Sequence, residues 1–407
     1  MDGLVLAGQG FDKLDLKRLP VPRPGRNQFL ARVDAVFACT SDGKLIESGS
    51  EHPLLAGWDT ERWPVVIGHE GCVTAVEVGE GLKGRVEPGQ AFALQPAINS
   101  GPVNFLERYP NVKSVRKTAI GYSLGGLFAE YVLIMEEVIE TGSLIPYDPA
   151  KIPYFAAAFS EPLSCVYSSQ NQVPHITKDA PAEPRRVRLG LKEGGVTLIL
   201  GSGTMGILHA DLAMSHRPRA IIMSEPMEER REQARGIIAA KAAGRGIDFI
   251  LTAPAGLADV IDRHTGGRGV DDCISALGVA KIQEESLKWL GPGGISVFFG
   301  GAKAGESLIT VDTRRIHYDG ISMVGSSGGD PSDVRAVMGL LESGEISPEL
   351  YVRRVGGLDA ALGLVRAVKG QEFFGKGLIY PHVRGPLRAV GGWSAAEEAE
   401  FLENNLP

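Results

Sequence analysis

The chain has 407 residues, 43% of them hydrophobic and 22% charged, which is the composition of a globular protein with two or three domains. Its formal net charge of −7 argues against a nucleic-acid partner, because such proteins usually carry a basic excess. No apolar stretch approaches the roughly 18 residues of a membrane span, so we expect no membrane partner. The four cysteines are widely spaced without a CxxC pair, and no signal-peptide pattern is evident. We therefore expect reduced thiols in a cytoplasmic protein.

Residues 1–165 alternate short apolar runs with Gly, Pro and Asp, a pattern that predicts a β-rich domain with few long helices. The runs expected to form strands include residues 29–37, 65–67, 73–78 and 91–94. Residues 171–195 contain several Pro, Arg and Lys residues without clear periodicity. We interpret this stretch as a surface loop or linker.

Strands and helices alternate in the second part of the chain. Short runs rich in Val, Ile or Phe are expected to form strands at residues 196–200, 220–223, 249–251, 270–274 and 295–299. Stretches of helix formers lie between them, for example residues 228–240 and 257–264. This alternation predicts an α/β fold with a doubly wound parallel sheet, a Rossmann domain within residues 166–320. Residues 321–407 are of mixed character and end in an exposed acidic helix, Ser394–Asn405.

A glycine-rich loop directly follows the first of these strands. Gly201, Gly203 and Gly206, with Thr204 and Met205 between them, form GxGxxG and open an apolar helix. Strand, loop and helix together are the setting in which this motif binds a dinucleotide, whereas the bare motif often marks only a turn. The first glycine permits the tight turn, the second lets the backbone approach a pyrophosphate, and the third allows close helix–strand packing. The helix N-terminus then supplies N–H groups for the phosphates.

A carboxylate lies just beyond the next strand. Glu225 is near the place where an acidic residue hydrogen-bonds the adenosine ribose, and it would repel the 2′-phosphate of NADP. We therefore expect NAD as the cofactor rather than NADP. Arg230 and Arg231 follow closely, and an arginine can accommodate the 2′-phosphate. NADP therefore remains an alternative cofactor.

Three polar sites stand out in residues 1–165. They contain Cys39, the pair His69-Glu70, and Glu161. A thiolate, an imidazole and carboxylates are the ligand set that binds zinc with an open catalytic position, where the ion polarises an alcohol oxygen. Each site alone is a weak signal, since a single cysteine is usually a small buried hydrophobe and a His-Glu pair is usually a surface pair. Their order ahead of a Rossmann segment strengthens the prediction.

These motifs together resemble the medium-chain dehydrogenase/reductase family, the zinc alcohol dehydrogenases. CTSD at 39–42, GHEG at 68–71, SEPLSC at 160–165 and VTLILGSGTMG at 196–206 are similar to the family's ligand and cofactor motifs, the third to its sorbitol dehydrogenase branch. The resemblance covers nearly all of residues 1–383. It implies a GroES-like catalytic domain in 1–165, a Rossmann domain in 166–320, and a return to the catalytic domain with a C-terminal tail in 321–407.

The resemblance also implies roles for single residues. Cys39 and His69 would bind one catalytic zinc, and Glu70 and Glu161 would share the remaining positions, one directly and the other directly or through water. Ser41 would hydrogen-bond the substrate hydroxyl and pass its proton outward. Asp42 would orient the His69 ring.

The chain departs from the family in two places. Many relatives carry four cysteines for a structural zinc near positions 95–115, and this chain has none there, so we expect one zinc per subunit or none. Many relatives also carry a histidine five residues after the ligand cysteine, where this chain has Lys44. Lys44 could relay a proton if burial depressed its pKa, bind a phosphate, or be a plain surface residue.

The C-terminal segment IHYDGISMVGSSGGD is similar to the sorbose-1-phosphate reductase-like subgroup. His317 and Tyr318 could line the substrate cleft, as in that subgroup, or be an aromatic pair that caps a strand. The resemblance implies that Ser326 lies beside the nicotinamide. The expected reaction is hydride transfer between NAD(H) and a secondary alcohol of a polyol, sugar or sugar phosphate, in a homodimer or homotetramer. Two alternatives are a zinc-free quinone reductase of the same fold and a non-catalytic NAD(H)-binding protein.

Overall fold

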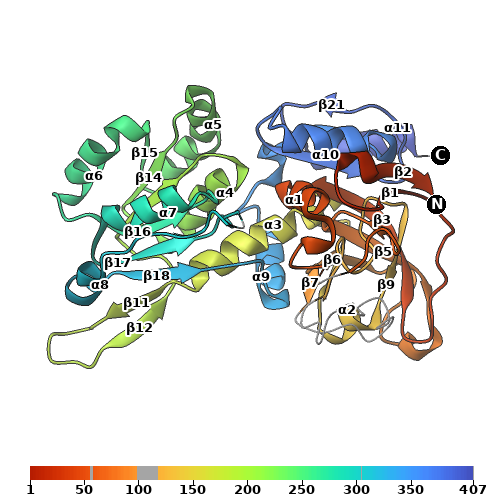
Figure 1. The fold of residues 1–407 in the computed structure, drawn as a ribbon, viewed down its shortest axis with the longest axis horizontal. Helices are drawn as coiled ribbons and strands as arrows, with labels where there is room; N and C mark the ends of the chain where they lie inside the picture. Colours follow the sequence, from red (N-terminus) through yellow and green to blue (C-terminus); the bar gives the residue numbers. More distant parts are fainter. Residues whose placement is uncertain (56–57, 99–117, 304, 407) are drawn as a thin grey trace. The chain divides into compact units, whose positions relative to one another are not determined.

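The computed structural model describes residues 1–55, 58–98, 118–303 and 305–406. It divides into two units, unit 1 with Met1–Ser164 and Asp330–Pro407, and unit 2 with Cys165–Gly329 (Figure 1). The chain returns to unit 1 at Asp330 rather than at residue 321, because strand β18 (Ser322–Gly325) pairs within the sheet of unit 2. No helix in the described ranges is long and apolar enough to cross a membrane.

Unit 1 is built around an eight-stranded sheet in the order β10-β6-β5-β3-β20-β19-β21, with β9 also paired to β3. Its strands and those packed beside it are β1 (Asp2–Leu6), β2 (Leu14–Arg18), β3 (Phe29–Ala38), β4 (Val65–Val66), β5 (Glu70–Val78), β6 (Ala91–Leu94), β7 (Ala97–Ile98), β8 (Thr118–Ala119), β9 (Tyr131–Ile134), β10 (Leu144–Tyr147), β19 (Val352–Gly357), β20 (Lys376–Tyr380) and β21 (Arg388–Ala389). The helices of unit 1 are α1 (Thr40–Ser48), α2 (Glu136–Glu140), the first part of α3 (Tyr154–Asn171), α9 (Pro331–Glu342), α10 (Ala361–Lys369) and α11 (Ala395–Asn405). The predicted β-rich domain is confirmed.

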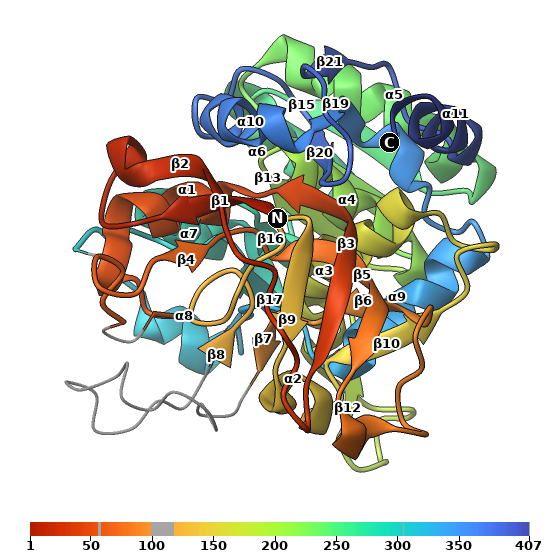
Figure 2. The ribbon, with the colours of Figure 1, turned by 90° about the vertical axis from the view of Figure 1, so that its right-hand side faces the viewer.

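The long strand β3 is the centre of this sheet (Figure 2). It runs antiparallel to β5 on one side and to β20 on the other, so its last residues face the first residues of both neighbours. Phe37 is opposite Glu70, and Ala38 is opposite Gly377. The register therefore brings three segments that are far apart in the sequence to the C-terminal end of β3.

The C-terminal helix α11 forms as predicted but is not wholly exposed. Ser394 caps its N-terminus, while Glu398 and Phe401 are buried. The Glu398 carboxylate accepts hydrogen bonds from the N–H groups of Tyr154 and Phe155 at 2.9 and 2.8 Å, and from the Tyr380 hydroxyl at 2.7 Å. It thus satisfies two donors at the start of α3, the helix that carries Glu161, in the way an N-cap residue does.

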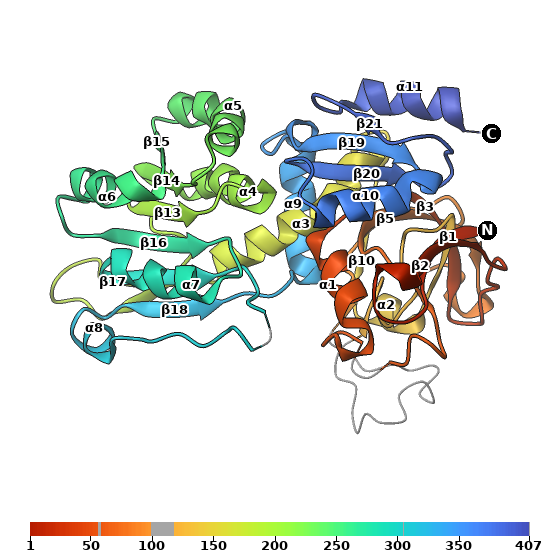
Figure 3. The same cartoon turned by 45° about the horizontal axis from the view of Figure 1, so that its top comes forward.

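Unit 2 contains a six-stranded parallel sheet in the order β15-β14-β13-β16-β17-β18, the strand order of a Rossmann fold. Figure 3 shows these strands side by side. The elements of unit 2 are β11 (Pro174–Thr177), β12 (Arg186–Leu189), β13 (Val196–Leu200), α4 (Thr204–Ala213), β14 (Ala220–Ser224), α5 (Glu228–Gly244), β15 (Asp248–Thr252), α6 (Leu257–Thr265), β16 (Val270–Ser275), α7 (Ala280–Ser286), β17 (Leu290–Phe298), α8 (Thr313–Tyr318) and β18. The predicted α/β fold with a Rossmann sheet is confirmed.

One expectation for unit 2 is wrong. Residues 171–195 are not a plain loop, because β11 and β12 pair there as an antiparallel hairpin. Each strand has only four residues, too few for alternation to be recognised in the sequence. His317 and Tyr318 belong to α8, which precedes β18, whereas the glycine loop follows the carboxyl end of the parallel strand β13. The two residues therefore lie at the opposite edge of the sheet from the loop.

Candidate functional site

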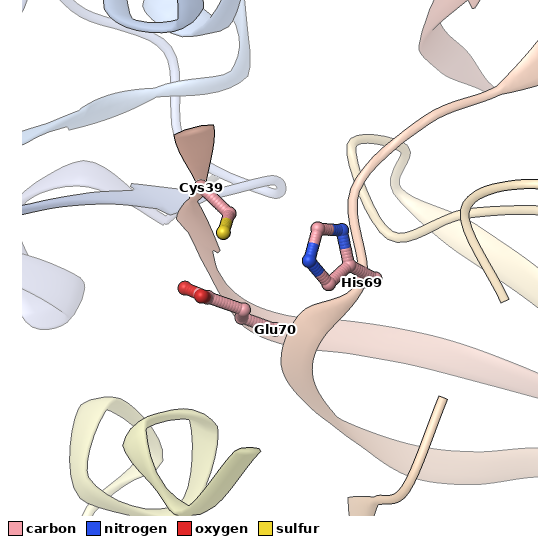
Figure 4. Close-up of side chains that lie close together, drawn as sticks. All are labelled: Cys39, His69 and Glu70. Carbon is pink, nitrogen blue, oxygen red and sulfur yellow. The ribbon is translucent and has the colours of Figure 1, made fainter. Parts of the chain in front are cut away.

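Three potential metal ligands meet where β3 ends (Figure 4). The ligand atoms of Cys39, His69 and Glu70 all lie within 4.8 Å of one another. His69 and Glu70 are buried, and the Cys39 thiol is half-buried. Figure 4 shows the three side chains pointing toward one another. A half-buried thiol with a buried imidazole and a buried carboxylate at this spacing forms a donor set that fits zinc.

Asp42 connects the segment that contains Cys39 to the segment that contains His69. Helix α1 begins in a capping box, in which the Cys39 sulfur accepts the Ser41 N–H at 3.4 Å and one Asp42 oxygen accepts the Cys39 N–H at 2.9 Å. The other oxygen of Asp42 lies 2.9 Å from Nδ1 of His69. Since a carboxylate can only accept, Nδ1 carries the proton and Nε2 is left as the ligand nitrogen. Asp42 thus has the position relative to His69 that the resemblance implies.

Protonation of His69 opposes metal binding. Burial alone would lower the pKa of His69, but Tyr122 and Asp42 outweigh it and raise the pKa well above its usual value. A metal ion would therefore displace a proton from this ring, so its binding should weaken as the pH falls.

Lys376 is a residue of the cluster that the sequence analysis missed. Its ammonium forms a hydrogen-bonded ion pair with Glu70, and both side chains are almost fully buried. Burial alone would lower the pKa of Lys376, but the charge of Glu70 outweighs it and raises the pKa. No local pattern marks this lysine, because it reaches Glu70 only through the pairing of β20 with β3.

Tyr122 and Glu161 border the cluster. The buried Tyr122 ring lies 5.2 Å from the His69 ring and 5.1 Å from the His52 ring, measured between centroids. Burial raises the pKa of Tyr122, so its hydroxyl stays protonated. Glu161 is buried in α3 and is not one of the three clustered ligands, but its charge acts on both Tyr122 and Lys376. The structure therefore places Glu161 beside the cluster rather than in it.

The other residues expected near the metal differ in exposure. Ser41 is half-buried in the first turn of α1, next to Cys39. Lys44 is exposed one turn later, so the burial that a relay lysine needs is not found. The stretch without structural-zinc cysteines falls largely on residues 99–117, outside the described residues. None of the four cysteines, all within the described residues, forms a disulfide bond.

The glycine loop of unit 2 lies at the carboxyl end of β13, beside the point where the strand order reverses. Gly201 has a φ of +97°, which favours glycine. A Cβ on Gly206 would lie 2.0 Å from the Gly201 carbonyl oxygen, so close packing requires glycine there. A Cβ on Gly203 would meet nothing within 4 Å, and Thr204 and Met205 open helix α4 beside it. The protein itself leaves the space at Gly203 open, which fits a bound pyrophosphate.

The remaining predicted cofactor residues lie at the same edge of the sheet. Glu225 follows β14 and accepts hydrogen bonds from the N–H groups of Ser202 at 3.0 Å and Met227 at 3.1 Å. The Arg230 guanidinium lies 3.9 Å from the same carboxylate. Ser326 follows the carboxyl end of β18 and is half-buried. The structure thus brings Glu225 and Arg230 together at the loop.

These two sites define a class of protein: a dehydrogenase with a GroES-like unit that can hold a metal and a Rossmann unit that can hold a dinucleotide. Residues 25–142 match the alcohol dehydrogenase GroES-like domain, and residues 201–343 match the zinc-binding dehydrogenase family. Mannitol-1-phosphate 5-dehydrogenase of Aliivibrio fischeri is 30% identical over 405 residues, covering 97% of this chain and 90% of that protein.

A second relative and a solved structure agree with this. L-sorbose 1-phosphate reductase of Klebsiella pneumoniae is 27% identical over 403 residues, covering 97% of this chain and 92% of that protein. The structure of 2R,3R-butanediol dehydrogenase from Bacillus subtilis has the same fold, with a TM-score of 0.72 at 20% identity, covering 93% of this chain and 99% of that chain. The chain belongs to the zinc-binding dehydrogenase family, which confirms the resemblance and makes the protein an oxidoreductase.

Proposed function

We propose that the protein transfers a hydride reversibly between NAD(H) and a secondary alcohol of a polyol, sugar or sugar phosphate. The observation that carries this proposal is the buried cluster of Cys39, His69 and Glu70 in a chain of this family. The names of the two relatives support the substrate class, since both act on a phosphorylated sugar or polyol. We also propose a homodimer or homotetramer, as the family resemblance implies, and a cytoplasmic location, which the widely spaced cysteines favour.

In this proposal Cys39, His69 and Glu70 hold one zinc ion. Glu70 is the direct carboxylate ligand, because its oxygen lies within the cluster and that of Glu161 does not. Glu161 then acts at longer range, through water or as an exchanging ligand. Zinc bound there would polarise the substrate oxygen and lower the pKa of its hydroxyl group.

The chain's own residues orient the site and move the proton. Asp42 holds the His69 ring through Nδ1 and, with the same carboxylate, fixes the start of α1. Ser41, which precedes Asp42 on that helix, accepts a hydrogen bond from the substrate hydroxyl and takes up its proton while it gives its own hydroxyl proton to the solvent. Lys376 balances the charge of Glu70 in a site from which water is largely excluded.

The loop from Gly201 to Gly206 and the N-terminus of α4 hold the cofactor's pyrophosphate in this proposal. Glu225 supplies a negative charge at the loop, which favours NAD over NADP. Arg230 and Arg231 both have partners within the protein. Arg230 lies beside Glu225, and Arg231 donates to the Pro226 carbonyl at 2.9 Å and pairs with Glu228.

Two alanine substitutions test the loop, because its glycines are required for different reasons. Gly203→Ala should leave the melting temperature almost unchanged, since the new Cβ meets no protein atom, but should raise the Kd for NADH about tenfold or more. Gly206→Ala should lower the melting temperature clearly, because its Cβ would clash with the Gly201 carbonyl. Thermal unfolding and NADH fluorescence titration measure both effects. Unchanged NADH affinity in Gly203→Ala would remove the loop from the cofactor site.

The proposed reaction is tested by following NADH absorbance with a panel of polyols, sugars and their phosphates, with and without added Zn²⁺, together with metal analysis. We expect turnover with a member of this panel and about one zinc per chain. Zinc content near zero with turnover on a quinone would favour the zinc-free reductase. Binding of NADH without turnover on any substrate would favour a non-catalytic NAD(H)-binding protein.

A further inference from the structure

Helix α1 has a polar face that begins at the metal cluster and leads away from it. Ser41 and Lys44 are three residues apart and therefore lie on one side of the helix, whereas Asp42, Leu45 and Ile46 are buried on the other. Within the described part of the chain, Lys44 forms no ion pair, while Glu47 on the same helix is paired with Lys369. No acidic side chain among the described residues thus forms an ion pair with Lys44.

His52 lies at the end of this face. A short 3-10 helix, η2 (Gly49–Glu51), continues from α1, and the His52 N–H donates to the Gly49 carbonyl at 3.0 Å. The half-buried His52 ring stacks on Tyr122 with an interplanar angle of 28°. Tyr122 in turn contacts the His69 ring. One aromatic ring therefore separates His52 from the metal cluster, and the stacking fixes the plane of its imidazole.

The hydrogen bonds of His52 determine what it can offer to a ligand. Its Nδ1 accepts the Leu54 N–H at 3.2 Å, so the neutral ring carries its proton on Nε2. Burial lowers the pKa of His52, and the positive charges of His69 and Lys44 lower it further. His52 is therefore neutral near pH 7 and presents one N–H donor.

Lys44 and His52 together present donors and no acceptor. A proton relay needs a group that accepts the proton, and neither residue offers one in this state. A phosphate group, whose oxygens accept several charge-assisted hydrogen bonds, matches such a pair. Among the described acidic residues between Asp42 and His52 in the chain, Asp42 binds His69 and the Cys39 N–H, Glu47 is paired with Lys369, and Glu51 is exposed.

We propose that Lys44 and His52 form the subsite for the phosphate group of a sugar-phosphate substrate whose reacting hydroxyl lies at the Cys39–His69–Glu70 cluster. This inference rests on the proposed function. It narrows the substrate class of that function to phosphorylated sugars and polyols. The Tyr122 ring lies between the two ends of the site and sets the distance between the phosphate and the reacting carbon. The subsite uses Lys44 at the position where many relatives carry a histidine.

The test compares mannitol 1-phosphate with mannitol, and sorbose 1-phosphate with sorbose. In Lys44→Met we expect the KM for the phosphorylated substrate to rise about tenfold to hundredfold with little change in kcat, while kcat/KM for the unphosphorylated partner stays within about twofold. His52→Phe, which keeps the stacking but removes the donor, should raise the same KM about tenfold. Lys44→Arg should retain most of the preference for the phosphorylated substrate.

The matched control is Lys83→Met, which removes an exposed lysine beyond the far end of β5 and should change neither substrate's KM. Calorimetric titration of the protein with mannitol 1-phosphate and with mannitol gives a readout that does not depend on turnover.

Equal Kd values of the wild-type protein for mannitol 1-phosphate and mannitol would overturn the subsite. An equal fall in kcat for both substrates in Lys44→Met would overturn the phosphate subsite and would favour a proton-relay role for Lys44. The protein could also bind the sugar phosphate in a way that depends on Lys44 but turn over no polyol. That result would refute the proposed function and leave the phosphate subsite in place.

Discussion

Cys39→Ser is expected to lose the bound zinc and to lower kcat/KM at least about a thousandfold, while the Kd for NADH stays within about twofold. A serine hydroxyl is a far weaker zinc ligand than a thiolate, and the substitution leaves only His69 and Glu70 of the clustered donors. The dinucleotide loop belongs to unit 2, so its affinity for NADH should not depend on this thiol.

Three measurements on the purified variant check this: zinc content by mass spectrometry, initial rates with the preferred polyol, and NADH fluorescence titration. Cys165→Ser is the matched control, because Cys165 is also a half-buried cysteine outside any disulfide bond but does not belong to the cluster. It should retain its zinc and most of its activity. A Cys39→Ser enzyme that keeps both zinc and turnover would remove Cys39 from the ligand set.

The parts of the fold that the sequence predicts are those where the pattern is local. The central strands of unit 2 are buried on both faces and therefore read as continuous apolar runs, as at Val196–Leu200 and Val270–Ser275. The glycine loop is also local, since its spacing and flanking elements lie within a few residues. For the same reason the pairing of Cys39 with Asp42 could be anticipated, because both belong to one helix start.

The parts that the sequence does not predict depend on strand register. Lys376 reaches Glu70 because Gly377 pairs with Ala38 and Glu70 pairs with Phe37, on opposite sides of β3. Lysine side chains are usually solvated. The burial of Lys376 is therefore explained only once its ion pair with Glu70 is known. His52 and Tyr122 are likewise brought together by the loop that contains Tyr122, and neither lies in a motif of its own.

The position of Glu161 shows the same limit. Its motif predicts a ligand, and the structure buries it in α3, whose first turn is capped by Glu398 from the far end of the chain. Whether such a carboxylate reaches a metal depends on a helix position set by residues more than two hundred positions away. The sequence could identify the candidate donors, and the fold decides which of them meet.

Lys376→Met is expected to destabilise the zinc-free protein by about 3–5 kcal/mol, because it leaves the Glu70 carboxylate buried without its cation. Zinc offers Glu70 another positive charge, so the loss of stability should be clearly smaller in the zinc-loaded protein. Denaturant unfolding of wild type and variant, each with zinc and with a chelator, measures the two differences. Lys376→Arg, which keeps the charge, should recover much of the stability.

The double variant Glu70→Gln/Lys376→Met separates charge from packing. Both buried charges are then removed, so the zinc-free double variant should be more stable than Lys376→Met alone, although it should bind zinc more weakly than wild type. Equal destabilisation of Lys376→Met with and without zinc would mean that Glu70 does not contact the ion. In that case Lys376 and Glu70 would be a structural pair, and Glu161 would become the carboxylate to test as the zinc ligand, because its charge already acts on Lys376.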